Sequence, residues 1–412
     1  MFPICGFAAT TTIGRGAPDP PHMKIIVVGA GINGVTAAIE LRTRGHEVIF
    51  IDPGPLPHPL AASTDISKAV RAAYGGDEQY SEMAERSIPV WRRWNEQFGT
   101  LFYEIGFLFL KNRSLQSGDF EFESLRVLDA LRHKVERISP AHLRERFPAW
   151  DPDIFPDGFL DVEAGYAESA RVVATLIEYA KSLGIQLREG TQFAALDESD
   201  GCVRGIICHD RGRLVADAVV MAVGAWTPHV LPFTQPFFRS TGQPVFHLRP
   251  KTPQLFVPER FPVFATDISS TGYYGFPLNR DGVVKVANHG PGREMSPDSS
   301  QRVVTPEEER SLRDFLSWAL PSLADAPIVS TRVCMYCDTH DGDFWIAADP
   351  ERQGLVLAAG DNGHGFKFAP VLGELIADAV EGKENPWSHR FRWRAEVQRQ
   401  AGKEAARYNP ER

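Results

Sequence analysis

The pattern of apolar and polar residues near the start of the chain predicts a strand, a helix and a second strand. Lys24–Val28 contains the β-branched run Ile-Ile-Val-Val, which is typical of a strand buried on both faces of a parallel sheet. A helix is predicted over Val35–Arg44, and Gly45 is placed to end it. Val48–Ile51 predicts the second strand, and Asp52 stands at its carboxyl end. We therefore expect a complete strand–helix–strand unit at the beginning of the fold.

The turn of this unit carries the motif Gly-Ala-Gly-Ile-Asn-Gly. Gly29 permits a tight turn, Gly31 lets the backbone approach a pyrophosphate at the helix N-terminus, and Gly34 allows close packing of helix on strand. The carboxylate of Asp52 can accept hydrogen bonds from ribose hydroxyls. The motif alone is weak evidence, but all the parts of a dinucleotide-binding unit stand here at the required spacing. The residues expected at the dinucleotide are Gly29, Gly31, Ile32, Asn33, Gly34 and Asp52.

Later segments first extend this pattern and then change it. An amphipathic helix over Ala170–Leu183 and an apolar strand over Ala218–Val223 are expected to join the same sheet. By contrast, Phe102–Leu110 and Thr241–His289 alternate in the manner of antiparallel strands. Pro306–Ala319 predicts a further helix. The chain is thus expected to combine a nucleotide-binding sheet with a second, β-rich part.

Composition and charge exclude several classes of protein. With 412 residues, 43% of them hydrophobic, the chain can bury a large core, which argues against a disordered or fibrous protein. Its 44 Lys and Arg against 53 Asp and Glu give a net charge of -9, so a nucleic-acid partner is not expected. No uncharged apolar run reaches the length of about 18 residues that crosses a bilayer, so a membrane is not expected either. Five cysteines are few and odd in number, which favours a reducing compartment, and we expect the cytoplasm.

Two motifs in the last third of the chain resemble the monomeric sarcosine oxidase family of flavoenzymes. They are Arg332-Val-Cys-Met-Tyr-Cys337 and Gly360-Asp-Asn-Gly-His-Gly-Phe-Lys367. This family includes N-methyltryptophan, pipecolate and fructosyl-amino-acid oxidases. The resemblance runs from about Lys24 to Gly382 and includes Gly224-Ala-Trp226, which looks like the family's second FAD contact. It implies FAD as the cofactor, a choice that the glycine motif alone cannot make.

The resemblance also implies a division of the chain. We expect an α/β fold in which a Rossmann-like FAD-binding domain of glutathione-reductase type is interrupted by an antiparallel β-rich substrate domain of α+β character. The expected boundaries are 1–22 for a disordered extension, 23–98, 156–238 and 334–400 for the FAD-binding domain, and 99–155 and 239–333 for the substrate domain.

In this family the cysteine that matches Cys334 is bonded through sulfur to the flavin 8α-methyl group. A thiolate is a suitable nucleophile for an electron-poor methyl group, and the alternative is a buried free cysteine. Cys337 creates a Cys-x-x-Cys spacing, which elsewhere indicates a redox pair or half of a zinc site. Because no second Cys pair or His at ligand spacing accompanies it, we expect no metal. Cys202 and Cys208 are expected to be packing residues.

Further residues take their expected roles from the resemblance. Lys285, in a predicted strand over 282–289, matches a lysine above the flavin that activates dioxygen, since a fixed cation stabilises superoxide. A surface lysine on an edge strand is the alternative. Arg71 and Lys367 match a pair that clamps the substrate carboxylate, although a solvated helix face would also explain Arg71. His289 corresponds to a substrate-contacting histidine, and Tyr336 to a pocket wall.

The resemblance also supplies the remaining cofactor contacts. Lys68 stands where sarcosine oxidase has an arginine near the flavin, and His364 is expected at the start of a helix that faces the flavin. The catalytic set expected from the resemblance is Lys285, His289, Arg71, Lys367 and Tyr336. The further cofactor-binding set is Lys68, Gly224, Trp226, Cys334, Gly363, His364, Gly365 and Lys367.

These expectations combine into a function. We expect an FAD-dependent oxidase that acts on the C–N bond of a secondary amine in an N-substituted amino acid and forms an imine and hydrogen peroxide. Asp338-Thr339 and Asp361 look more like fructosyl-amino-acid oxidases, which keeps an Amadori-product oxidase open. A dehydrogenase that passes electrons to a quinone or protein is the second alternative, and a non-catalytic flavin-binding regulator the third. The expected partners are a small-molecule amine and dioxygen, in a monomer or weak dimer.

Overall fold

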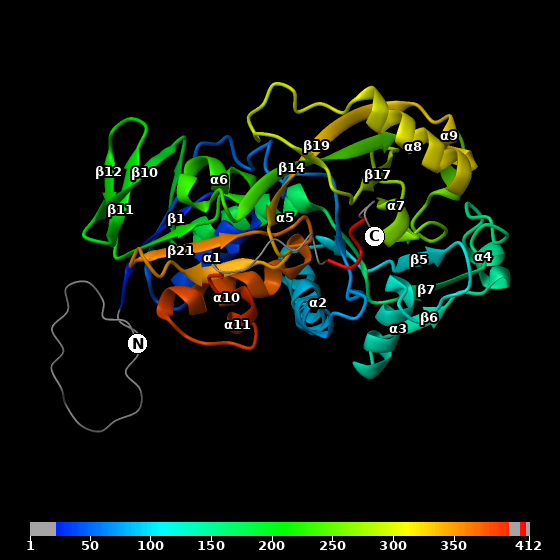
Figure 1. Ribbon diagram of the computed structural model, residues 1–412, viewed down its shortest axis with the longest axis horizontal. Helices are drawn as coiled ribbons and strands as arrows, with labels where there is room; N and C mark the ends of the chain where they lie inside the picture. Colours follow the sequence, from blue (N-terminus) through cyan, green and yellow to red (C-terminus); the bar gives the residue numbers. More distant parts are fainter. Residues whose placement is uncertain (1–21, 395–403, 409–412) are drawn as a thin grey trace.

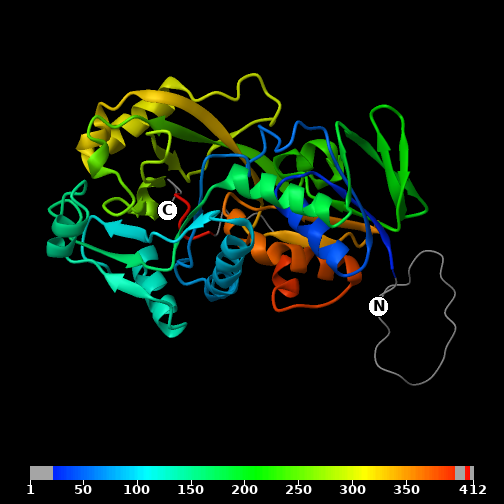
Figure 2. The same ribbon diagram turned by 180° about the vertical axis from the view of Figure 1, so that it is seen from behind.

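The computed structural model describes residues 22–394 and 404–408 (Figure 1). The expected disordered extension over 1–22 lies outside the described residues except for its last residue, and so do residues 395–400 of the last expected FAD-binding segment. Two large sheets and two small ones make up the fold. Figures 1 and 2 show an elongated molecule with β10, β11 and β12 at one end and α3 and α4 at the other.

The first large sheet has six strands in the order β20-β21-β13-β1-β2-β9. All neighbours in it run parallel except β20 and β21. Its strands are β1 (Lys24–Val28), β2 (Glu47–Asp52), β9 (Gln186–Glu189), β13 (Ala218–Met221), β20 (Trp345–Ala348) and β21 (Leu355–Ala359). Helix α1 (Ile32–Thr43) packs against α5 (Ser169–Ser182) and α10 (Ala369–Glu381) beside this sheet. The predicted strand–helix–strand unit is confirmed, although the helix begins at Ile32 because part of the glycine motif forms its first turn.

The second large sheet has nine strands, in the order β18-β14-β17-β16-β15-β5-β7-β6 with β19 paired to β14. Its pairs are antiparallel except β15 with β5, which confirms the expected antiparallel character. The strands are β5 (Phe107–Lys111), β6 (Val135–Arg137), β7 (Asp157–Asp161), β14 (Phe238–Leu248), β15 (Val263–Thr266), β16 (Tyr273–Phe276), β17 (Val284–Asn288), β18 (Arg293–Glu294) and β19 (Ile328–Thr339). Helix α8 (Pro306–Ala319) packs its apolar side into the core of this part, beside α9 (Pro321–Ala324).

The remaining elements connect or flank these two sheets. One small sheet joins β3 (Lys68–Val70), β8 (Gly165–Ala167) and β4 (Phe102–Tyr103), and the other joins β10 (Phe193–Ser199), β11 (Cys202–Cys208) and β12 (Arg213–Val215). The other helices are α2 (Glu78–Phe98), α3 (Phe120–Ala130), α4 (Pro140–Arg146), α6 (Thr227–Val230), α7 (Ile268–Thr271) and α11 (Ser388–Phe391). Among the described residues, no helix is long and apolar enough to cross a membrane.

Strand pairing shows to which sheet two strands near the expected domain boundaries belong. β7 follows residue 156 in the chain, yet its hydrogen bonds join β5 and β6 in the nine-stranded sheet. β19 continues past residue 334 and pairs with β14 along its whole length. Both strands therefore belong to the β-rich part, because hydrogen-bond partners and not chain position decide the sheet. The long strand β19 brings the Cys334 region from the β-rich part to the edge of the six-stranded sheet.

Candidate active site

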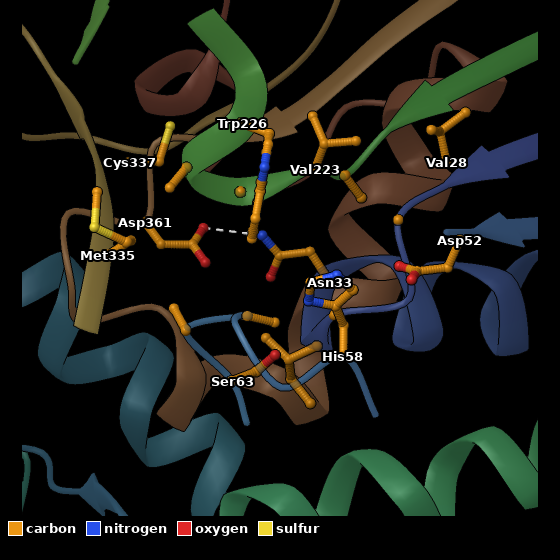
Figure 3. A pocket seen from close by; sticks show the side chains of 18 of the residues that line it. Val28, Asn33, Asp52, His58, Ser63, Val223, Trp226, Met335, Cys337 and Asp361 are labelled. Carbon is orange, nitrogen blue, oxygen red and sulfur yellow. Dashed lines mark hydrogen bonds between the residues drawn. The ribbon is translucent and has the colours of Figure 1, made fainter. Parts of the chain in front are cut away.

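A cavity of about 520 Å³ lies at the carboxyl ends of β1, β2 and β13, where open α/β sheets bind their ligands. Val28 and Asp52 line one end, and Met335, Cys337 and Asp361 line the other (Figure 3). The cavity therefore extends from the glycine-rich turn to β19 and joins the two large sheets.

The glycine-rich turn is shaped by close backbone contacts. A Cβ atom on Gly29 would lie 2.5 Å from the carbonyl oxygen of Ala222, and φ of Gly29 is +100°. A Cβ atom on Gly34 would lie 1.8 Å from the Gly29 carbonyl oxygen, so this glycine serves packing and does not line the cavity. Gly31 caps α1 without a side-chain hydrogen bond and faces the cavity. Free N–H groups at a helix start suit a pyrophosphate, so the turn fits FAD.

Asp52 holds this turn as well as lining the cavity. Its two carboxylate oxygens accept hydrogen bonds from the backbone nitrogens of Ala30 and Gly54, both at 2.8 Å. Each oxygen keeps a second lone pair for a ribose hydroxyl. Ile32 and Asn33 also line the cavity, as expected for the first turn of the helix.

The far end of the cavity collects most of the other predicted cofactor residues. Lys68, Gly224, Trp226, Cys334, Gly363 and Gly365 all line it. The indole nitrogen of Trp226 donates to both carboxylate oxygens of Asp298, at 3.0 and 2.9 Å, and its ring meets His58 edge-on. Asp298 and His58 were not predicted, because neither stands in a recognisable motif. All three side chains line the cavity.

The two thiols of the Cys-x-x-Cys segment have different surroundings. The Lys68 ammonium donates to Cys334 Sγ at 3.2 Å, and both side chains line the cavity. Burial raises the pKa of the Cys337 thiol to about 12. Both cysteines are 3% exposed, so the Lys68 ammonium beside Cys334 Sγ is the contact that distinguishes the two thiols.

Asp361 lines the larger cavity, although the sequence analysis names it only as a feature that resembles fructosyl-amino-acid oxidases. Its Oδ1 accepts a hydrogen bond from Asn33 Nδ2 at 2.9 Å (Figure 3). Burial raises the pKa of this carboxyl to about 6. A Cβ atom on Gly365 would lie 2.7 Å from Asp361 Cγ, and one on Gly363 would lie 2.1 Å from the Tyr336 ring. These two glycines therefore make room for the side chains that line the cavity.

A second cavity of about 60 Å³ adjoins the first. Lys68, Gly363 and Phe366 line both cavities. The smaller one is also lined by Arg71, Phe107, Phe109, Tyr274, His289, His364 and Lys367. His364 and Lys367 thus face this cavity and not the larger one, where the predicted cofactor set had placed them. Tyr336, which belongs to the expected catalytic set, lines the larger cavity and not the smaller one.

The predicted cationic pair meets in the smaller cavity. Lys367 Nζ donates to the Tyr74 hydroxyl at 2.7 Å and to the His364 carbonyl oxygen at 2.6 Å. Burial holds the pKa of Lys367 well below its usual range, and the Arg71 charge acts in the same direction. Arg71 stacks on the Tyr74 ring, 4.4 Å from its centroid. Tyr74 thus positions both cations.

His364 does not begin a helix. It lies in a turn before a 3-10 segment over Phe366–Phe368, and α10 begins only at Ala369. Its Nδ1 is 3.1 Å from the Tyr74 hydroxyl, and burial lowers its pKa well below the ordinary value.

A glutamate far along the chain pairs with two residues that line this cavity, Arg71 and His289. Glu404 is buried, and its carboxylate oxygens lie 2.9 Å from Arg71 Nη2 and 2.9 Å from His289 Nε2. His289 Nδ1 is 3.3 Å from the Tyr336 hydroxyl. Burial lowers the pKa of His289, although the contact with Glu404 acts in the opposite direction. Nothing in the local sequence marked Glu404.

Lys285 is a buried lysine and not a surface one. It is 1% exposed, and its Nζ donates to Asp65 Oδ2 at 2.7 Å and to the Ser67 carbonyl oxygen at 2.6 Å. Burial lowers the pKa of Lys285 to about 8, against the opposing effect of Asp65. Lys285 lines neither of the two cavities. Asp65 links it to Lys68, at 3.7 Å, which lines both.

Comparison with known proteins gives a family and a fold. A family model described as "DAO: FAD dependent oxidoreductase" matches residues 24–379. Monomeric sarcosine oxidase from Bacillus sp. (strain B-0618) is 28% identical over 374 residues, which cover 88% of this chain and 93% of that protein. L-saccharopine oxidase from Schizosaccharomyces pombe is 28% identical over 414 residues, covering 90% and 93%. The crystal structure of the fructosamine oxidase Amadoriase II from Aspergillus fumigatus, in complex with FSA, matches with a TM-score of 0.81 at 24% identity, covering 95% of this chain and 94% of that one, and shows the fold alone.

Proposed function

Because the chain belongs to the FAD dependent oxidoreductase family, we propose that it is an FAD-dependent oxidase of the C–N bond of a secondary amine in an N-substituted amino acid. The observation that carries this proposal is the smaller cavity, where Arg71, His289 and Lys367 face a space that adjoins the larger one. Sarcosine oxidase and saccharopine oxidase, the relatives compared above, are named for substrates of this type.

The larger cavity would hold FAD through the residues already described. The glycine-rich turn and the start of α1 suit its pyrophosphate, and Asp52 suits its ribose. When bound, FAD would supply the acceptor for a hydride equivalent from the carbon beside the amine nitrogen, and the electrons would then pass to dioxygen. We propose Cys334 as the point of covalent attachment, since its side chain lines the larger cavity beside the Lys68 ammonium.

The smaller cavity would bind the amine in the form that the reaction requires. Arg71 offers a planar donor group for a carboxylate, and Lys367 a second donor. Burial disfavours the charged forms of His289 and Lys367, and the same burial disfavours a charged amine. A neutral amine keeps the lone pair that stabilises the carbon as it loses its hydride. The aromatic walls of Phe107 and Phe109 exclude water from this space.

Two lysines and one aspartate would supply a positive charge for oxygen chemistry. Lys285 and Lys68 share the Asp65 carboxylate, which leaves one net positive charge in the cluster. Lys68 brings that charge to the cavity walls, while Lys285 is fixed behind it. A fixed cation in a site that excludes water stabilises negative charge that develops on dioxygen. We therefore keep Lys285 as an oxygen-activating residue that acts together with Lys68.

An anaerobic spectral titration of the holoenzyme tests the proposal. N-methyl amino acids, cyclic imino acids and fructosyl amino acids are added separately, and bleaching of the flavin absorbance is followed. We expect bleaching by one of the first two groups and peroxide on admission of air. Bleaching by fructosyl amino acids alone would favour an Amadori-product oxidase. Reduction without oxygen consumption would favour a dehydrogenase, and no bleaching by any amine would overturn the proposal.

The oligomeric state and the cellular location of the enzyme are separate predictions. We expect a monomer or weak dimer in the cytoplasm, which size-exclusion chromatography and cell fractionation would test.

A further inference from the structure

The C-terminal segment 404–408 lies against the smaller cavity, and we call it the C-terminal strap. Figure 1 shows it as a red segment beside the label C, well inside the outline of the molecule. Glu404 is 6% exposed and Ala406 is 2% exposed, and Ala406 lines the smaller cavity. The strap is therefore part of the wall of the proposed amine site.

Several contacts outside the cavity hold the strap in place. Arg407 donates to both carboxylate oxygens of Asp338, each at 2.7 Å, and its Nε donates to the Gly290 carbonyl oxygen at 2.9 Å. The backbone nitrogen of Tyr408 donates to the His289 carbonyl oxygen at 2.9 Å. A bidentate arginine–carboxylate pair has a fixed geometry, so these contacts hold Glu404 at a defined place.

The Glu404 carboxylate lies where an anion would bind. One of its oxygens accepts from Arg71 Nη2 and the other is paired with His289 Nε2, both at 2.9 Å. Although burial alone would raise it, these partners hold the pKa of Glu404 well below its usual range. The other terminal nitrogen of Arg71 donates to the Ala73 carbonyl oxygen. Both terminal nitrogens of the guanidinium are therefore engaged within the protein.

Without Glu404, Arg71 would be a buried cation without a counterion. Its side chain is 8% exposed, and the ion pair with Glu404 is the one that neutralises it among the described residues. A buried charge without a partner is costly, whereas exchange of one carboxylate for another leaves the charge of the site unchanged. Entry of a substrate carboxylate at the positions beside Arg71 Nη2 and His289 Nε2 therefore requires that Glu404 give way.

We propose that Glu404 is a tethered ligand of the Arg71–His289 anion site, which holds the place of the substrate carboxylate and is exchanged for it on binding. This inference rests on the proposed function and adds the residue that sets affinity for acidic substrates. It gives the strap two effects: it stabilises the site before substrate binds, and it competes with every carboxylate that enters.

Calorimetric titration of the oxidised holoenzyme with acetate tests this proposal without turnover. Glu404→Gln keeps the size of the side chain and removes its charge. We expect acetate to bind about ten- to a hundredfold more tightly to this variant, the range expected when a charge-assisted competitor is removed. Glu384→Gln is the matched control, because this exposed glutamate should leave the affinity unchanged. Unchanged or weaker acetate binding in Glu404→Gln would overturn the proposal, and weaker binding would make Glu404 a fixed part of a site for amines without a carboxylate.

A second variant keeps the proposal testable if Glu404→Gln does not fold. Asp338→Asn combined with Arg407→Gln removes the outer ion pair and leaves Arg71, His289 and Glu404 in place. We expect tighter acetate binding here as well, and unchanged binding in both variants would overturn the proposal.

The test also separates the two proposals, because acetate is not oxidised. If acetate binds more tightly but no N-substituted amino acid bleaches the flavin, the proposed function fails and the tethered ligand stands. If such amino acids bleach the flavin and acetate affinity does not change, the tethered ligand alone fails.

Discussion

Replacing Lys285 by methionine removes one half of a buried ion pair and leaves the other half in place. Asp65 and Lys285 are each 1% exposed in their side chains and lie 2.7 Å apart. Although burial alone would raise it, Lys285 and Lys68 hold the pKa of the Asp65 carboxyl well below its usual range. Among the described residues, the Lys68 ammonium at 3.7 Å is then the nearest cationic partner of this carboxylate, and the Arg332 charge also acts on it.

The expected loss follows from the geometry of the pair. Removal of one partner of a buried pair lowers the free energy of unfolding by about 3–5 kcal/mol. Because Lys68 still offsets part of the charge, we expect the lower end, about 3 kcal/mol. The double variant Asp65→Asn with Lys285→Met removes both charges and should recover most of this loss. Lys24→Met is the matched control, since its 3.5 Å pair with Glu47 is exposed and should contribute less than about 1 kcal/mol.

Two measurements separate stability from oxygen chemistry. Urea unfolding of the holoenzyme gives the stability, and stopped-flow mixing of the reduced enzyme with dioxygen gives the rate of reoxidation. Loss of the fixed cation should slow reoxidation by about 10²–10³-fold, the range for removal of one preorganised electrostatic group. Reduction by the amine should change much less. A double variant less stable than Lys285→Met would refute the ion-pair argument, and an unchanged reoxidation rate in Lys285→Met would refute the oxygen role.

Three further predictions test other parts of the site. Acid precipitation should leave the unmodified protein yellow and release flavin from Cys334→Ser, whereas the control Cys208→Ser should keep it; full extraction from the unmodified protein would contradict the covalent link. Lys367→Met should weaken binding of an N-substituted acid by about ten- to a hundredfold, or 1.5–3 kcal/mol, since it removes a hydrogen bond to a carboxylate. Titration with the acid and its amide checks this, and equal losses for both would argue against the carboxylate clamp. Although burial alone would lower it, contacts with Asp161 and Glu85 raise the pKa of His133 from 6.5 to about 10. Its stabilising effect is therefore fully present below pH 6.5 and is lost as the pH rises through 10. Urea unfolding should show that His133→Gln costs more stability at pH 6.5 than at pH 10, and equal costs would show that its protonation does not stabilise the fold.

The local sequence pattern was sufficient to predict those strands, helices and turns whose signals lie within their own residues. The β-branched run Lys24–Val28 forms β1 over the same residues, because only a strand buried on both faces suits such a run. The helix over Pro306–Ala319 has the predicted ends, since Thr305 and Glu308 form a capping box at its start. The glycine-rich turn was also predictable, because a tight turn and close packing leave room for no other residue.

Motifs were sufficient for many of the residues that line the larger cavity, but not for His58 and Asp298, and not for the division of residues between the two cavities. The spacing of a motif indicates that its residues lie close together. It does not say which way each side chain points, and so His364 was expected at the cofactor and Lys367 at both cofactor and substrate, whereas both residues line the smaller cavity. Alternation along β17 likewise indicated that one face is buried, but the layers packed on that face decide whether Lys285 is exposed.

The amino-acid sequence by itself determined the glycine-rich turn, the strand–helix–strand unit around it, the helix over Pro306–Ala319, and the two motifs that meet at the cavities. The tertiary structure decided which charges meet. Glu404 lies 333 residues from Arg71, and Asp361 lies 328 residues from Asn33, so no local pattern relates these pairs. The physical reason is that a buried charge must find its partner in space, and the packing of distant segments alone decides which residue is near enough to be that partner.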